Sequence, residues 1–206
     1  MPAPRLYLAS QSPRRLQLLG QLGLSPALLL PADTDAAEAL EAVKPGEGPA
    51  AYVRRVTRLK LREAVQRLRQ RALPDAPVLC ADTTVTLNAA ILGKPRDAQD
   101  AAAMLRQLAG ATHRVLTAVA VQAGGVRHEA LSTSRVRFAA LSDADIAAYI
   151  DSGEWQGKAG AYAIQGQAAA FIEHISGSHS GIMGLPVFET ARLLRQAGVA
   201  FAQSAP

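Results

Sequence analysis

The sequence predicts an α/β protein built around one ligand cleft. Short apolar runs that suit buried strands alternate along the chain with longer segments of helical periodicity. The 206 residues suffice for one substantial α/β domain, or for two small lobes around a cleft. A hydrophobic fraction of 49% beside 19% charged residues is ordinary for a globular protein. Aromatic residues make up only 4%, so we expect a core of leucine, valine, isoleucine and alanine.

The first strand-to-helix connection predicts an anion site. Residues 5–9 suit a strand, and the Ser-Pro-Arg-Arg sequence at residues 12–15 supplies a good N-cap, a proline for the first turn and two arginines. We expect the helix to stop at Gly23. Free N–H groups, the helix dipole and the guanidinium groups would converge there on an anion. A plain capped helix with two solvated arginines is the alternative.

A long helix is expected at residues 49–73, after a strand at residues 24–31 and an acidic, alanine-rich segment. Lys60 shares the apolar face of this helix with Val53 and Val56. A lysine on such a face usually extends its ammonium group to water. If a cleft lies there, Lys60 would instead bind phosphate or pair with Asp82.

Residues 78–95 form the most informative stretch of the chain. Residues 78–81 are an apolar run typical of a buried strand, and we expect Asp82 at its end. Thr83 places a hydroxyl beside it, and a second β-rich run leads through a turn and a short return strand to Lys94. Ligands of α/β proteins commonly bind at such a strand end, facing a crevice. The alternative, that Asp82 caps a turn and Lys94 is solvated, has equal weight from this stretch alone.

The C-terminal half predicts further helices and strands, joined by loops. Ser142 and Asp145 form a capping box that marks one helix start. We expect helices at residues 97–108, 142–153 and 186–196, strands at residues 114–122, 126–138 and 171–175, and a polar loop at residues 176–184.

A loop of small residues at 157–166 carries Lys158 and Gln165. Small residues let a ligand approach the backbone closely, and the Gln165 carboxamide would suit the edge of a nucleobase. A glycine-rich hairpin turn is the alternative. Of the 22 basic residues only four are lysines (Lys44, Lys60, Lys94 and Lys158). A compact ammonium suits phosphate, so this placement indicates phosphate chemistry, with chance as the alternative.

Charge and composition limit the partners and the location. The net charge of +5 favours anionic partners weakly, and no aromatics interleave with the arginines of the long helix, which disfavours nucleic acid. No run approaches the roughly 18 apolar residues of a membrane helix, and we expect no signal peptide. The single cysteine, Cys80, fits a reducing cytosol, so we expect a cytoplasmic protein. The four histidines lack metal spacing, and we expect His174 alone to lie near the cleft.

Six short motifs, taken together, resemble the Maf family. They are LASQSPRR at residues 8–15, ADT at 81–83, LGKP at 92–95, LAG at 108–110 with His113, KAGAY at 158–162 with IQG at 164–166, and GLP at 184–186. Their order and approximate spacing match the family from about residue 6 to residue 195. The form of the fifth motif resembles the branch that acts on dTTP and UTP, rather than the branch that acts on 7-methyl-GTP.

The resemblance implies a nucleoside triphosphate pyrophosphatase that releases a nucleoside monophosphate and pyrophosphate. It implies a two-lobed, mixed-sheet α/β fold similar to the inosine triphosphatase fold, with residues 1–206 in a single domain around one cleft. It further implies a divalent cation, Mg²⁺ or Mn²⁺, and a homodimer. The alternative within this resemblance is a regulator of septum formation and cell division that binds nucleotide or a partner protein with little catalysis.

The resemblance also assigns site residues. It implies that Asp82 is the catalytic acid, that Lys94 assists it, and that Asp82 holds the metal. The positions linked to substrate choice are Arg14, Thr83 and Gln165, and the other cleft residues are Ser10, Arg15, Lys60 and Lys158. The family's second catalytic acid, a Glu, is replaced: ungapped spacing puts Thr34 there, so we expect Asp35 to serve as second catalytic acid and metal ligand.

Overall fold

A single mixed sheet of seven strands organises the computed structural model, which describes residues 5–32 and 40–201. The strand order is β2-β1-β3-β5-β6-β7, and β4 pairs with β3 off this path. The strands are β1 (Tyr7–Leu8), β2 (Ala27–Leu28), β3 (Val78–Leu87), β4 (Ala90–Leu92), β5 (Thr112–Ala123), β6 (Val126–Phe138) and β7 (Ile172–Ser176). The α-helices are α1 (Pro13–Gly20), α3 (Pro49–Gln70), α4 (Ala98–Leu108), α5 (Asp143–Asp151), α6 (His179–Met183) and α7 (Val187–Gln196). The predicted fold class, α/β with a mixed sheet, is confirmed.

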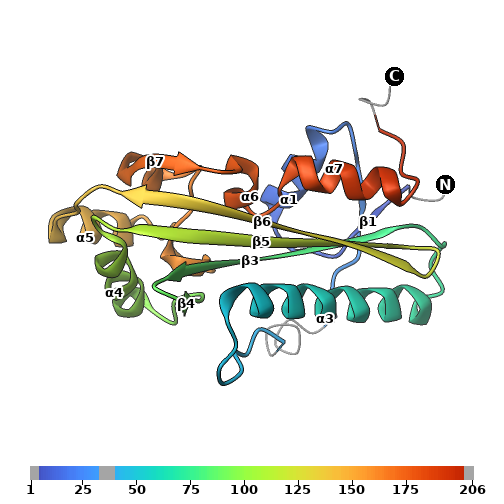
Figure 1. Ribbon diagram of the computed structural model, residues 1–206, viewed down its shortest axis with the longest axis horizontal. Coiled ribbons are helices and arrows are strands. Elements are labelled where there is room, and N and C mark those ends of the chain that lie inside the picture. Colours follow the sequence, from blue (N-terminus) through green and yellow to red (C-terminus); the bar gives the residue numbers. More distant parts are fainter. Residues whose placement is uncertain (1–4, 33–39, 202–206) are drawn as a thin grey trace.

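Helices cover both faces of the sheet, with α3 on one side and α1, α6 and α7 on the other (Figure 1). The pleat of β3 divides the core accordingly, because successive side chains point to opposite faces. Val78 and Cys80 pack against Leu61 of α3, in one cluster of buried residues. Leu79 and Ala81 belong to the larger cluster on the opposite face. Asp82 therefore follows Val78 and Cys80 onto the α3 face.

A gap along the edge of β3 is the feature that makes room for a site. The short parallel strand β1 pairs with β3 only at Val78 and Leu79, and β4 pairs only from Val85 to Leu87. Between these pairings, no described strand lies along this edge of β3. The loop that leaves β1 turns away into α1, and a crevice forms at the carboxyl end of a parallel strand, where α/β folds commonly bind ligands.

The prediction that Asp82 ends a strand is wrong. Strand β3 continues without interruption to Leu87, and Asp82 lies opposite Ala118 of β5 in an antiparallel ladder. The residues after Asp82 include three threonines, which are β-branched and suit a pleated strand. The carboxylate is thus held in the middle of a long strand rather than at a mobile end.

Other boundaries differ from the predictions in modest ways. The first two strands are only two residues long each, and α1 ends at Gly20. The loop at residues 176–184 contains the helix α6, which we did not predict, and residues 157–166 contain the 3₁₀ turn η1 (Ala159–Ala161) instead of a hairpin. A second 3₁₀ segment, η2 (Gln167–Phe171), precedes β7. Local signals were more reliable: the Asp97 cap of α4 and the Ser142 capping box of α5 are both confirmed.

Within the described ranges, none of the helices combines the length and the apolar character that a membrane crossing requires.

Candidate active site

One cavity of about 830 Å³ lies against the gap in the edge of β3. This volume suits a small-molecule ligand, since such sites usually measure roughly 300–1,000 Å³. All predicted site residues that the structure describes line this cavity: Ser10, Arg14, Arg15, Lys60, Asp82, Thr83, Lys94, Lys158 and Gln165. Asp35 lies outside the described residues, so the structure does not test its predicted role.

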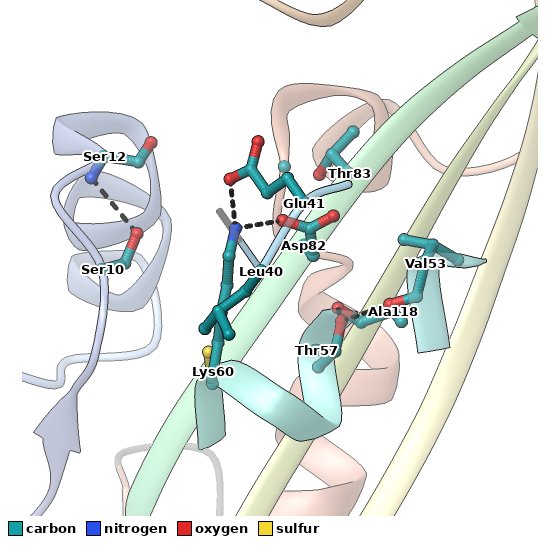
Figure 2. Close-up of polar contacts among 12 residues, drawn as sticks. Ser10, Ser12, Leu40, Glu41, Val53, Thr57, Lys60, Asp82, Thr83 and Ala118 are labelled. Carbon is teal, nitrogen blue, oxygen red and sulfur yellow. Dashed lines mark hydrogen bonds and ion pairs between the residues drawn. The ribbon is translucent and has the colours of Figure 1, made fainter. Parts of the chain in front are cut away.

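A lysine joins two carboxylates on the α3 side of this cavity. The Nζ atom of Lys60 lies 2.6 Å from Oδ1 of Asp82 and 2.5 Å from Oε1 of Glu41 (Figure 2). The Lys60 side chain is only 20% exposed, so its ammonium group serves the cavity rather than bulk water. Of the roles that the sequence left open for Lys60, the structure shows the pairing with Asp82, and it places Lys60 in the cavity wall.

Glu41 is a charged cavity residue that sequence reasoning missed. Its other carboxylate oxygen lies 3.2 Å from Nζ of Lys94, so one carboxylate contacts both lysines of this wall. The backbone carbonyl of Glu41 accepts a hydrogen bond of 2.9 Å from the Tyr52 hydroxyl, and Arg55 donates to two neighbouring carbonyl groups. No local motif marks Glu41 in its alanine-rich segment. The only signal is its contact with α3, which sequence alone does not reveal.

Burial and pairing shift the pKa values of this charged cluster. Burial raises the pKa of Asp82, and the nearby Glu41 adds to this rise, while Lys60 opposes it. Burial alone would lower the pKa of Lys60, but Asp82 and Glu41 outweigh it, so the pKa is raised. Burial alone would raise the pKa of Glu41, but Lys60 and Lys94 outweigh it, so the pKa is lowered. Asp82 is therefore the carboxylate with enhanced proton affinity, as a general base requires.

Arg15 connects three segments of the cavity wall. Its Nε donates to the Gly184 carbonyl at 2.8 Å, and its Nη1 donates to the Ser10 hydroxyl at 3.0 Å. Its Nη2 lies 3.5 Å from Oγ1 of Thr83. The N–H groups of the guanidinium thus contact the loop before α1, the residue after α6 and the strand β3. Arg15 shapes the cavity in addition to contributing positive charge to it.

The hydrogen bonds of Thr83 fix what its hydroxyl can offer a ligand. Oγ1 of Thr117 donates to the Gly181 carbonyl at 2.7 Å. The 2.9 Å contact between Thr83 Oγ1 and Thr117 Oγ1 therefore uses the Thr83 proton. Thr83 faces the cavity as a hydrogen-bond acceptor, which suits the N–H group of a nucleobase.

Arg14 and Lys158 form a second positive region of the cavity wall. Burial, and next the charge of Arg15, lower the pKa of Arg14. Burial, and next the charge of Arg14, lower the pKa of Lys158. The protein partners found for these two cations are the carbonyl groups of Met183 and Gln156. Because the cations repel one another, an anion bound between them would relieve that repulsion.

The loop with Lys158 and Gln165 is fastened to β3 and to its return strand. The N–H group of Gly160 donates to the Gly93 carbonyl at 3.0 Å. Gly160 has a φ of +68°, and a Cβ atom there would lie 2.9 Å from Cγ1 of Val85, so both the backbone and the packing demand glycine. Gln165 is exposed at the cavity, where its carboxamide is available to a ligand.

The histidine prediction is wrong. His174 is exposed on β7 and is not among the residues that line the cavity. His113 is instead the histidine beside the site: it is buried, and its Nε2 lies 2.8 Å from the hydroxyl of Tyr162, which lines the cavity. The strand pairing explains this, since β7 is the edge strand farthest from β1, whereas His113 lies on β5 next to β3.

A buried carboxylate in a cavity of this size, whose wall also holds Arg14, Lys60 and Lys158, is typical of an enzyme that cleaves phosphate anhydrides by positioning and charge neutralisation. Comparison with known sequences identifies the family. Residues 5–197 match the family described as Maf-like protein, and the chain belongs to that family.

Similar curated proteins cover nearly the whole chain. The dTTP/UTP pyrophosphatase of Albidiferax ferrireducens is 62% identical over 193 residues, which are 94% of this chain and 96% of the relative. The dTTP/UTP pyrophosphatase of a Polaromonas species is 62% identical over 200 residues, 97% of this chain and 99% of the relative. That of Cupriavidus pinatubonensis is 62% identical over 196 residues, with 95% and 98% covered.

Proposed function

We propose that this protein hydrolyses dTTP and UTP to the nucleoside monophosphate and pyrophosphate. The observation that carries this proposal is the buried Asp82 carboxylate, bonded to Lys60 inside a cavity whose wall also holds Arg14 and Lys158. Relatives 62% identical over nearly the whole chain carry the name dTTP/UTP pyrophosphatase, which supplies the substrates. The biological role is removal of nucleotides from the cellular pool.

The reaction needs a water molecule, a proton acceptor and neutralisation of a polyphosphate. The water oxygen bonds to the α-phosphorus, and the bond between that phosphorus and the bridging oxygen breaks, so pyrophosphate leaves with the electron pair. Asp82, with its enhanced proton affinity, accepts the proton that the water gives up. Lys94, assisted by Lys60, neutralises charge on the leaving pyrophosphate.

The residues present fit a divalent cation. Mg²⁺ usually binds one or two protein carboxylates together with substrate phosphates, and Asp82 and Glu41, which share the ammonium group of Lys60, offer such a pair. Among the described residues, no group of three His, Cys, Asp or Glu side chains could hold a metal ion. Asp35 remains a proposed additional ligand. A bound Mg²⁺ or Mn²⁺ would supply Lewis-acid neutralisation of the phosphates.

Base recognition is proposed for the residues beside the small-residue loop. Gln165 offers one donor and one acceptor, and the acceptor-only face of Thr83 complements the N–H group of thymine or uracil. Arg14, whose pKa is lowered by burial and by Arg15, would bind the phosphate adjoining the sugar. Ser10 and Arg15 complete the wall around this end.

Three further properties belong to this proposal. The whole chain forms one domain whose two lobes enclose the cleft, and the enzyme works as a homodimer. Its location is the cytoplasm, in line with the single buried thiol, Cys80. The alternative function, a regulator of septum formation with little catalysis, is favoured only if the second catalytic acid is lost, because Thr34 occupies the expected position.

A substrate panel tests the proposal. Purified protein is incubated with dTTP, UTP, CTP, the purine triphosphates and 7-methyl-GTP, each with magnesium or manganese, and pyrophosphate and orthophosphate are assayed separately. We expect pyrophosphate from dTTP and UTP. Pyrophosphate mainly from 7-methyl-GTP would keep the reaction and overturn base reading by Gln165. Absence of product from every nucleotide would overturn the enzymatic proposal in favour of the regulator.

The base-reading role has its own test. Gln165→Ala should change the ranking of substrates while hydrolysis persists, because Gln165 is exposed at the cavity and takes no part in the proposed proton transfer. An unchanged ranking of dTTP, UTP and CTP by kcat/KM would refute this role.

A further inference from the structure

The residue after Gln165 is a glycine for a reason that lies outside the cavity. Gly166 has an extended backbone with a φ of −104°, outside the left-handed region that favours glycine. A Cβ atom at this position would overlap Oε2 of Glu154 and lie 2.8 Å from its Cδ. The Glu154 carboxylate therefore packs directly on the backbone of Gly166. Both residues lie outside the set of described residues that line the cavity.

The same carboxylate accepts a hydrogen bond from the backbone. The N–H group of Gln167, the first residue of η2, lies 2.9 Å from Oε2 of Glu154. A bond to an ionised acceptor is stronger than a neutral one. On the other side of Gln165, Ile164 is only 5% exposed and belongs to the main core cluster. Fixed neighbours on both sides thus determine where the exposed Gln165 side chain lies.

The backbone of Glu154 is itself anchored to α5. Its N–H group donates to the Ser152 hydroxyl at 3.2 Å, and that hydroxyl donates to the Tyr149 carbonyl at 2.6 Å. The indole N–H of Trp155 donates to the Ile150 carbonyl at 3.0 Å. Tyr149 is only 2% exposed, so the end of α5 is held in the core. The carboxylate is therefore presented by a fixed segment rather than by a free loop.

The charge of Glu154 has a second, longer-range effect. It partly offsets the fall in the pKa of Lys158 that burial and Arg14 cause. Glu154 could thus act as a hydrogen-bond acceptor for the turn or as a charge near Lys158. The hydrogen bond to Gln167 and the packing on Gly166 are direct contacts, and the geometry favours the first role.

We propose that Glu154 is a positioning residue for base recognition, whose carboxylate holds the Gln165 turn against the end of α5. Gly166 is then a glycine because any side chain there would displace that carboxylate. This inference rests on the proposed function, since it takes Gln165 as the residue that binds the nucleobase. Glu154 acts through Gln165 and does not contact the substrate.

Binding of dTMP, a product of the proposed reaction, tests the inference without turnover. Titration calorimetry compares the wild-type protein with Glu154→Ala, Gln165→Ala and the variant that carries both substitutions. Glu154→Ala should raise the Kd for dTMP about fivefold, because the hydrogen bond that fixes the turn is lost. In the Gln165→Ala background, the same substitution should change the Kd by less than about twofold. An undiminished further loss in that background would overturn the proposal, since Glu154 would then act on another part of the site.

Gly166→Ala provides an independent route to the same state. The atom that a Cβ would overlap is the end of a flexible side chain, so we expect the carboxylate to move away while the fold survives. The Kd for dTMP should rise about fivefold, and adding Glu154→Ala should raise it no further. Melting temperatures check that each variant is folded. Additive losses in the Gly166→Ala/Glu154→Ala variant would contradict the coupling between these two residues.

Two controls separate the hydrogen bond from the charge. Glu154→Gln keeps an acceptor oxygen for Gln167 but removes the charge near Lys158, so the Kd should stay within about twofold of the wild-type value. Asp151→Ala removes an exposed carboxylate at the end of α5 and should leave the Kd unchanged. A loss in Glu154→Gln as large as in Glu154→Ala would overturn the proposal in favour of a charge effect.

Hydrolysis of dTTP by the wild-type protein is measured separately. If hydrolysis is absent while the dTMP results hold, the proposed reaction fails and the role of Glu154 stands. If hydrolysis is normal while Glu154→Ala leaves dTMP binding unchanged, the reaction stands and the role of Glu154 fails. If Gln165→Ala does not weaken dTMP binding, base reading by Gln165 and this inference fail together.

Discussion

Two buried ionisable side chains lie on neighbouring strands, and they offset the desolvation cost of burial in different ways. On β3, Asp82 is 7% exposed, burial raises its pKa, and Lys60 pairs with it at 2.6 Å. On β5, His113 is 1% exposed among Phe138 and Tyr162, with edge-to-face ring contacts of 5.0 Å and 5.4 Å between centroids. Desolvation lowers the pKa of His113 to about 4, so the ring is neutral at physiological pH.

The two side chains have different roles: Asp82 can react with a ligand in the cavity, whereas His113 stabilises the surrounding structure. A buried charge persists only when it is paired, and pairing with Lys60 keeps Asp82 available to a ligand in the cavity. His113 avoids the desolvation penalty by giving up its charge, and it serves packing and one hydrogen bond to Tyr162. Burial of an ionisable side chain therefore does not by itself indicate catalysis, whereas an ion pair in a cavity wall does point to it.

The largest expected effect concerns the charged cluster. Asp82→Asn keeps the volume and removes the proton acceptor, so hydrolysis of dTTP should fall about 10³-fold, equal to about 4 kcal/mol in activation free energy. The fold should survive, because Lys60 still pairs with Glu41. Pyrophosphate release and the melting temperature are the measurements. A variant that releases pyrophosphate at the normal rate would remove Asp82 from the chemistry.

Removing the shared cation should be nearly as costly. Lys60→Met leaves the Asp82 and Glu41 carboxylates without the ammonium between them, and breaking such a buried pair costs about 3 kcal/mol. Urea unfolding at pH 7 measures this loss, with Lys44→Met on the exposed loop as control. Since protonation neutralises a buried carboxylate, the deficit should shrink as the pH falls. A Lys60→Met variant as stable as the control would contradict the account of this cluster.

The neutral His113 predicts a pH-dependent stability, because this side chain becomes charged on protonation whereas a carboxylate becomes neutral. Because the folded-state pKa of about 4 lies below the ordinary value of 6.5, the unfolded chain takes up a proton first as the pH falls. The stability contribution is therefore present above pH 6.5 and is lost progressively toward pH 4. Between pH 7 and pH 5 this loss amounts to about 2 kcal/mol.

His113→Gln isolates that effect, since the amide can still bond to Tyr162 but does not titrate. The difference in unfolding free energy between the wild-type protein and this variant should narrow by about 2 kcal/mol from pH 7 to pH 5. Urea unfolding at both pH values measures it. A difference that does not depend on pH would show that His113 is not held neutral.

The smallest change in unfolding free energy is expected at the surface, where a charged side chain stays solvated whether or not it is paired. Arg137 and Glu173 have side chains that are 51% and 48% exposed, and they bond to one another at 2.8 Å. Glu173→Gln should change the unfolding free energy by only about 0.5 kcal/mol, because solvent screens such pairs. The same urea series includes this variant. A loss as large as that of Lys60→Met would erase the distinction between the buried cluster and an ordinary ion pair.

Sequence reasoning succeeded where the physical cause is local. Side-chain caps set the starts of α4 and α5, and alternation of apolar and polar residues set the bounds of β6. The helical period also placed Lys60 toward the body of the protein, because the face of a helix follows from spacing alone. The motifs that resemble the Maf family placed the remaining cavity residues, and the structure gathers them in one cavity.

Sequence reasoning failed where the cause lies in a distant segment. The continuation of β3 past Asp82 depends on pairing with residues of β5 that lie 28 to 34 positions away in the chain, from Thr86 with Arg114 to Thr83 with Thr117. Glu41 is in the cavity only because Tyr52 and Arg55 hold its segment against α3. His113 was judged less relevant than His174 because strand order, not spacing, decides which histidine lies near the cleft.

The hydrogen bond between Gly160 and Gly93 has a consequence for engineering. The turn that carries Lys94 and the loop that carries Lys158 and Gln165 are joined through it, and Val85 leaves no room for another side chain at residue 160. These segments behave as one module. Anyone who grafts the loop of a relative to alter base preference would have to transplant the β3–β4 hairpin with it, since a loop exchanged alone would carry its cations out of alignment.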